Sequence, residues 1–359
     1  MGVFFIFLNI LLLVIFIKSI FKICFVIIGT IIGAGFASGK EIYTFFCIYG
    51  INGLWGILIS NSIIGVVIYL TFKAVLENDI KTYSDFTKYL VGSNKVLNYT
   101  INNLMNVFLL ISFVVMVSGF GAYFNQEFGF PIIFGSLIIA LLTFFTFFKN
   151  IDGIVKINTL LIPILIFLVV LLVFKENLFN FDASKLPTVS GFSWIFKSIL
   201  YASYNSILLI PIIINLQNLI LNKRQVKHII AITLSIMIIL SLVIFIILNL
   251  NIAKIQAIEI PIVFIANKFG LIYKYLYGLT ILIAIFTTAV SQGYSFLNNI
   301  SRNKNQYFVY SILICVLSIT FSNVGFGNLL DVLYPLLGVL GLVQIAFLCI
   351  SSRDYKRQH

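Results

Sequence analysis

The chain has 359 residues, of which 61% are hydrophobic and 9% are charged. A soluble domain carries about 25% charged residues, so this composition excludes an ordinary soluble protein and indicates a membrane protein that has lipid as its solvent. The formal net charge is +12, but the cations lie between the apolar segments, where they set membrane topology. No nucleic-acid partner is expected.

A helix needs roughly 20 mostly apolar residues to cross about 30 Å of hydrocarbon, and ten segments from residue 21 onward qualify. Short alternating strands typical of a membrane β-barrel are not seen. The sequence therefore predicts an all-α integral membrane bundle. The ten predicted spans, numbered in chain order, are residues 21–48, 53–75, 97–124, 130–148, 154–174, 192–221, 226–250, 272–299, 306–322 and 328–350.

Residues 1–20 form an extra N-terminal hydrophobic segment ahead of the first span. Its apolar run, Val3–Ile17, is short for a span and has neither the basic start nor the small-residue cleavage site of a signal peptide. This segment is expected to be an additional membrane-spanning helix or a helix on the membrane surface. Alternatively, it is an artefact of the assigned start codon.

The basic residues are distributed unequally between the two sides of the predicted bundle. Sixteen of the 23 Lys and Arg residues lie before or at the start of the first span, in the four alternate loops on that side, and at the C-terminus. Cytoplasmic loops carry the excess of such residues. We therefore expect a multi-pass protein of the cell membrane, with the stretch before the first span and the C-terminus both in the cytoplasm.

The ten spans divide into two halves of five, residues 21–174 and 192–350, followed by a cytoplasmic tail at 351–359. Five spans are an odd number, so the second half enters the membrane from the side opposite to the first. This arrangement is typical of the inverted repeats of secondary transporters. The span count predicts one transporter domain over residues 21–350.

A glycine-rich stretch, GTIIGAGFASGKE at residues 29–41, lies inside the first predicted span. Glycine destabilises a helix by about 1 kcal/mol relative to alanine. The spacing of Gly29 and Gly33, and of Gly35 and Gly39, is compatible with close helix packing. Gly-Ala-Gly followed closely by Ser, Gly, Lys and Glu instead favours a broken helix, whose free carbonyls bind a cation and whose free amides bind an anionic group.

This glycine-rich stretch resembles the opening signature of the YkvI family of bacterial membrane proteins, and the resemblance extends over all ten spans. That family belongs to the amino acid/polyamine/cation transporter superfamily. The resemblance implies a LeuT-type bundle, with a five-plus-five inverted repeat and the first and sixth spans broken at mid-membrane. It supplies no substrate.

The wider fold implies a Na⁺ site between the break of the first span and the middle of the eighth. The site is formed by two carbonyls of the first span, one carbonyl of the eighth span and two adjacent hydroxyls of the eighth span. Oxygen ligands of this kind suit a hard cation. Alternatively, the two threonines bond back to carbonyls of their own helix. The candidate Na⁺ ligands are Gly29, Ile32, Ala284, Thr287 and Thr288.

Proton coupling is the competing hypothesis. Some relatives of this fold replace Na⁺ with a lysine from the middle of the fifth span, where this sequence has none and where Lys156 lies only at the cytoplasmic end. Glu41 is the only carboxylate well inside the outer half of the first span, and ionisable groups in spans are functional candidates. We expect Glu41 to be a proton carrier, a gate partner or a structural hydrogen-bond acceptor.

A substrate site is predicted beside the break of the first span. The carboxylate of a small solute, such as an amino acid, is expected to dock on the amides of residues 33–38. The sixth span is expected to be interrupted at Asn205 and Pro211 and to face the same site. The candidate substrate-binding residues are Gly33, Ala34, Gly35, Phe36, Ala37, Ser38, Tyr201, Tyr204 and Asn205.

Polar residues on two further spans are weaker candidates for the same solute pathway. Those of the third span lie in its outer half, and those of the eighth span lie at its inner end, where they would line a vestibule. These residues are Ser118, Gly119, Gly121 and Tyr123, and then Ser291, Gln292, Asn298 and Asn299.

The sequence thus predicts a secondary transporter, most simply a Na⁺-coupled symporter, with no cofactor other than that ion. His228 and His359 are the only histidines, and no HExxH, GxSxG or Walker motif is present, so neither an enzyme nor an ATP-driven pump is expected. The alternatives are an H⁺-coupled transporter, a channel, and a permease-like sensor subunit that binds solute without transport.

Overall fold

The computed structural model describes residues 19–358 except 93, 149–151 and 177–180. Almost the whole extra N-terminal segment predicted at residues 1–20 therefore lies outside the described residues. Within the described part the chain is helical, and extended pairing is limited to a single bridge between Gly50 and Thr188.

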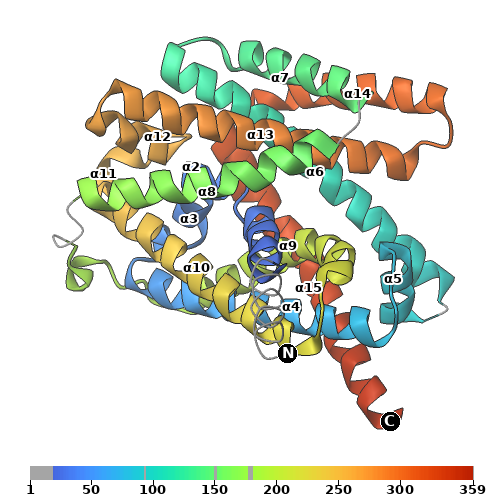
Figure 1. Ribbon diagram of the computed structural model, residues 1–359. Helices are drawn as coiled ribbons and strands as arrows, with labels where there is room; N and C mark the ends of the chain where they lie inside the picture. Colours follow the sequence, from blue (N-terminus) through green and yellow to red (C-terminus); the bar gives the residue numbers. More distant parts are fainter. Residues whose placement is uncertain (1–18, 93, 149–151, 177–180, 359) are drawn as a thin grey trace, which may run out of the picture.

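All ten predicted spans are helices in the structure (Figure 1). Among the described residues, seven helices are long and apolar enough to cross a membrane, and three shorter apolar helices, Ser19–Ile31, Ile132–Phe147 and Leu160–Leu172, take the remaining positions. The first span consists of Ser19–Ile31, α2 (Ala34–Ser38) and α3 (Lys40–Phe45); the others are α4 (Ile51–Glu77), α6 (Lys95–Phe128), α7 (Ile132–Phe147), α8 (Asp152–Lys175), α9 (Ser193–Leu216), α10 (Lys223–Leu250), α13 (Leu271–Ile300), α14 (Lys304–Ser322) and α15 (Phe326–Gln358).

The outer surface of the bundle carries large apolar side chains. Phe145 is 62% exposed, Phe174 79% and Ile272 80%. Extended apolar surface of this kind is unfavourable in water and matches a hydrocarbon solvent. The buried interior is also mostly apolar, so these helices are hydrophobic all round, as spans are.

The long helices pack in two groups. In one group α9 lies against both α4 and α15, and α10 packs on α4; in the other, α6 contacts α7, α13 and α14. Figure 1 shows the second group across the top of the molecule and the first group below it. The first span and α8 lie between the groups. This division positions the site, because the space between two packed groups is where a solute can be enclosed.

Several short helices connect the spans and were not predicted. On one face of the bundle, α5 (Tyr83–Val91) starts at Thr82, whose hydroxyl accepts a hydrogen bond from the backbone N–H of Asp85. On the other face lie α11 (Ile252–Ile255) and α12 (Pro261–Ala266), and proline at the first position suits a helix start. Among the described residues, 3₁₀ turns also connect the spans: η1 (Cys47–Tyr49), η3 (Ala183–Lys185), η4 (Gln217–Leu219) and η5 (Asn267–Phe269).

The predicted interruption of the sixth span is wrong. Helix α9 is continuous from Ser193 to Leu216 and includes Pro211. Asn205 lies within this helix, and its Nδ2 donates to the carbonyl of Tyr201 at 2.9 Å, one turn earlier. Proline removes a single backbone bond, and in this membrane helix the remaining bonds and the packed neighbours keep the helix intact.

Candidate functional site

The first span is broken at the predicted glycines. Its first helix ends at Ile31, and Gly33 is extended, with ψ −175°, before α2 begins at Ala34. A second change of direction occurs at Gly39, which has φ +81° between α2 and α3. A residue with a side chain is strained at that φ, so glycine is needed there.

A cavity of about 430 Å³ lies beside the break. It is lined by the first helix, α2, α6, α9, α13 and α15, and extends from Glu41 to Tyr83 of α5 and Asn299 at the end of α13. Ser295 and Asn299 are exposed at that end. The cavity is therefore open toward the face of the bundle that carries α5.

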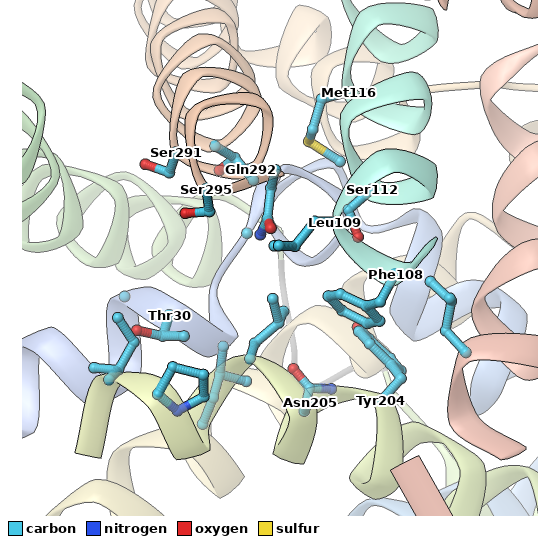
Figure 2. Close-up of a pocket in the computed structure, with 18 of the residues that line it drawn as sticks. Thr30, Phe108, Leu109, Ser112, Met116, Tyr204, Asn205, Ser291, Gln292 and Ser295 are labelled. Atoms are coloured by element: carbon cyan, nitrogen blue, oxygen red, sulfur yellow. The ribbon is translucent and has the colours of Figure 1, made fainter. Parts of the chain in front are cut away.

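The polar side chains of the cavity face one another across it (Figure 2). Ser112 of α6 and Ser291, Gln292 and Ser295 of α13 form one wall, while Asn205 of α9 lies on the opposite wall. The amide oxygen of Asn205 is turned into the cavity and has no hydrogen-bond partner, although the residue is only 1% exposed. The cavity thus presents an unused acceptor.

Glu41 lies at the closed end of the cavity, opposite Tyr83 and Asn299, and its side chain is directed back toward α2. It is 3% exposed, and its Oε2 accepts a hydrogen bond from the hydroxyl of Tyr204. Its Oε1 lies so close to Gly35 that a Cβ at that glycine would overlap it. The turn at Gly39 brings the carboxylate to this position.

Tyrosine rings surround this carboxylate. The rings of Tyr204 and Tyr334 have centroids 4.8 Å apart, and both line the cavity. Tyr201 packs edge-on against Tyr204 at 5.5 Å but lies behind it, outside the cavity wall. Its hydroxyl is buried beside the side chain of Asn205.

The face opposite α5 is closed by polar contacts between elements far apart in the sequence. Thr44 donates to Asp331 of α15 at 2.7 Å, and Tyr277 of α13 donates to the carbonyl of Ala37 at 2.9 Å. Gln126 of α6 bonds both the N–H and the carbonyl of Ile260, at 2.9 and 3.2 Å. These contacts hold α2, α3 and the start of α12 over this end of the cavity.

The structure places the predicted substrate residues in two sets. Four of them line the cavity: Gly33, Ala34, Tyr204 and Asn205. The other five are packed beside it: Gly35 lies under Glu41, Ser38 bonds the carbonyl of Gly35 at 2.8 Å, and Phe36, Ala37 and Tyr201 are buried.

The candidate cation ligands also lie around the break. Gly29 and Thr288 line the cavity, whereas Ile32, Ala284 and Thr287 are buried. The hydroxyl of Thr287 donates to the carbonyls of Ile283 at 3.0 Å and Ala284 at 3.1 Å. These bonds use the hydroxyl proton of Thr287 and leave a lone pair of its oxygen for a cation. Within the described residues, no group of three His, Cys, Asp or Glu side chains has the arrangement of a metal site.

Some cavity residues were found by sequence reasoning and others were not. Of the weaker candidates, Ser291, Gln292 and Asn299 line the cavity, but Ser118 instead bonds the carbonyl of Ser322 at 3.2 Å. The candidates Gly119, Gly121, Tyr123 and Asn298 are not in the wall either. The residues missed are Thr30, Ser112, Ser295 and Tyr334, whose only sequence signal is a polar atom within an apolar span.

No protein-family profile matches the chain. Its backbone is similar to that of Mhp1 in an inward-facing conformation, with a TM-score of 0.66, 14% identity, and coverage of 94% of this chain and 76% of that one. A Na⁺-coupled sialic acid symporter in an outward-open state matches with a TM-score of 0.53, 13% identity, and coverage of 89% and 76%. The fold is thus that of the LeuT-type transporters, as the glycine signature implied.

The resemblance to the YkvI family is confirmed by a sequence relative. The chain is 27% identical over 348 residues to the uncharacterized membrane protein YkvI of Bacillus subtilis (strain 168). The alignment covers 94% of this chain and 97% of that protein.

Proposed function

We propose that the protein is a Na⁺-coupled symporter of a small solute, such as an amino acid, and that it works by alternating access. The observation that carries this proposal is the cavity beside the broken first span, open toward one face and closed by side-chain contacts toward the other. A channel would need a continuous path, and the contacts of α2 and α3 interrupt it.

The excess of basic residues assigns the α5 face to the cytoplasm. On that assignment the cavity is open inward, and the opposite end is the closed outer gate. Outward opening then requires α2 and α3 to leave Asp331 and Tyr277, while the helix Ser19–Ile31 closes against α13.

Sodium would drive that closure. The carbonyls of Gly29 and Ile32 belong to the first span, whereas Thr287 and Thr288 belong to α13, so one ion bound by both would hold the two elements together. Because Gly29 and Thr288 face the cavity, the ion would leave toward the open face once they separate. An ion that binds one conformation more tightly shifts the population toward it.

The test is the thermal stability of the purified protein as Na⁺ replaces K⁺ at constant ionic strength. Occupancy of the site at a hundred times the Kd stabilises the folded state by about 2.7 kcal/mol. We expect Na⁺ to raise Tm in the wild type and not in the double variant Thr287→Ala, Thr288→Ala. Thr280→Ala is the matched control, since Thr280 bonds back to Leu276 at 2.8 Å on the same helix, outside the cavity.

A Na⁺ response that survives in the double variant would refute the site, and a response absent from the wild type would refute Na⁺ coupling. Accumulation of labelled solute in vesicles under a Na⁺ gradient then separates a symporter from a channel or a sensor. A channel equilibrates the solute without accumulating it, and a sensor does not move it.

Proton coupling is a second candidate, favoured by the buried position of Glu41 on the cavity wall and its bond to Tyr204. A carboxylate that takes up and releases a proton as the cavity changes sides would couple flux to the pH gradient. Uptake driven by a pH gradient in K⁺ alone, and lost in Glu41→Gln, would replace Na⁺ coupling with this mechanism.

A further inference from the structure

Among the residues that the structure describes, the cavity wall carries a single charged side chain. Its lining residues include Glu41 and no Lys, Arg, His or Asp within the part of the chain that the structure describes. The remaining polar groups are neutral hydroxyls and amides. An ionised Glu41 therefore gives the cavity wall a net negative charge.

No protein cation neutralises this carboxylate among the described residues. The adjacent Lys40 is directed elsewhere, with its Nζ against the ring of Tyr43, 5.5 Å from the centroid, and beside Gly327. Lys197 lies over the ring of Phe45, with its Nζ 5.8 Å from the centroid. A buried carboxylate without a counter-charge is costly, so a positively charged occupant of the cavity would stabilise it.

The groups around Glu41 suit an organic cation. Tyr204 and Tyr334 present aromatic rings beside the carboxylate, and the faces of such rings attract ammonium and guanidinium groups. The Nδ2 of Asn205 is used by the carbonyl of Tyr201, which leaves its Oδ1 free to accept a hydrogen bond from an N–H donor.

The same geometry disfavours an anionic group at the break. The Oε1 of Glu41 lies against Gly35, within the stretch on which a substrate carboxylate was predicted to dock. Like charges that share a site repel each other. A solute that carries only a negative charge would have no cationic partner in the described wall.

We propose that the transported solute is a net positively charged amine or guanidine whose cationic group pairs with Glu41 and contacts the rings of Tyr204 and Tyr334. This inference rests on the proposed transport function and defines its substrate class. The solute's charge is neutralised by the protein, and any carboxylate that it carries is dispensable.

The test is equilibrium binding to the purified protein, read as a rise in Tm, in K⁺ and again in Na⁺. The matched probes are arginine, agmatine and citrulline. Agmatine lacks the carboxylate of arginine, and citrulline has a neutral group in place of the guanidinium of arginine. We expect arginine and agmatine to bind at least tenfold more tightly than citrulline. Glutamate is expected to give no shift at 10 mM, a probe concentration of about a hundred times a typical substrate Kd.

Glu41→Gln should remove the preference for the two cations, and Glu77→Gln is its matched control. Glu77 lies at the end of α4, 3.9 Å from Lys73 and 4.0 Å from Lys223, outside the cavity. Glu41→Asp keeps the charge and should keep the preference at lower affinity. It also serves if Glu41→Gln does not fold.

Equal binding of citrulline or glutamate, no binding of arginine and agmatine, or an unchanged preference in Glu41→Gln would each overturn the proposal. Binding is measured here without transport, so its failure is distinct from a failure of vesicle accumulation. A wild type whose Tm responds to pH but to none of these cations would identify the occupant of Glu41 as a proton, and that too would overturn the proposal.

Discussion

The hydroxyl of Thr44 in α3 donates a hydrogen bond of 2.7 Å to Asp331 in α15, 287 residues later in the chain. Helix α3 also carries Glu41, which lines the closed end of the cavity. The bond from Thr44 therefore helps to hold α3 over the cavity on the face opposite α5. Asp331 is exposed, so the bond is expected to contribute as an ordinary hydrogen bond does, about 0.5–1.5 kcal/mol, which changes a population several-fold to about tenfold. It is therefore large enough to bias the equilibrium between open and closed gates.

Thr44→Val should release this gate without changing the size of the side chain. Cys47 begins η1, two residues after the end of α3, and is 3% exposed, so opening of the gate should increase its reaction with a maleimide by several-fold to about tenfold. Labelling in detergent, read residue by residue by mass spectrometry, measures this. Cys315, which is buried against the carbonyl of Ala140, should label at the wild-type rate. An unchanged rate at Cys47 would show that this bond does not hold the gate.

Gly35→Ala should displace the carboxylate of Glu41, because a Cβ at residue 35 overlaps it. We expect a fall in Tm of several degrees. In a double-mutant cycle, adding Glu41→Ser should restore part of the loss, since the shorter side chain removes the overlap. Gly33→Ala is the stability control, because no atom lies within 4 Å of its added Cβ. Additive effects of the two changes would contradict the packing of Glu41 on Gly35.

Lys274→Met should destabilise the protein strongly. Lys274 of α13 pairs with Glu127 of α6 at 2.6 Å, and the Glu127 side chain is only 4% exposed. Removing one partner of a buried pair costs about 3–5 kcal/mol. Lys88→Met breaks an exposed pair with Asp85, 3.6 Å apart, and should cost less than about 1 kcal/mol. Comparing the Tm of the two variants tests this, and equal losses would show that the Glu127 pair is not buried in the working protein.

A fluorescent-protein fusion at the C-terminus should be fluorescent in bacterial cells, because such a fusion matures in the cytoplasm and not after export. The physical reason is the excess of basic residues on that side of the bundle. A fusion in the loop between α10 and α13 should be dark, and an exported-phosphatase reporter should give the reverse pattern. The opposite result would turn the open cavity toward the outside.

Much of the fold could be predicted because its signals are local. Apolar runs defined all ten spans, and the run of glycines located the break at Gly33. The continuity of α9 through Pro211 could not be predicted, since it depends on helices packed around the proline. Short helices such as α12 also escaped, because six residues carry no detectable period.

The site was predicted less completely for a geometric reason. Glu41 was recognised as unusual, but its position over Gly35 depends on the turn at Gly39, which no spacing rule supplies. Ser112 and Tyr334 enter the wall only through the rotation of α6 and α15 about their axes. The sequence indicated which residues are chemically special, while packing decided which of them face the cavity.

Gly39 separates the short helices α2 and α3, which contact different packing groups. Helix α2 contacts α12 and α13, whereas α3 contacts α9, α10 and α15. The left-handed joint between them, at φ +81°, therefore lies on the boundary between the two packing groups. Bending at this joint would change the distance between Glu41 in α3 and Gly35 in α2.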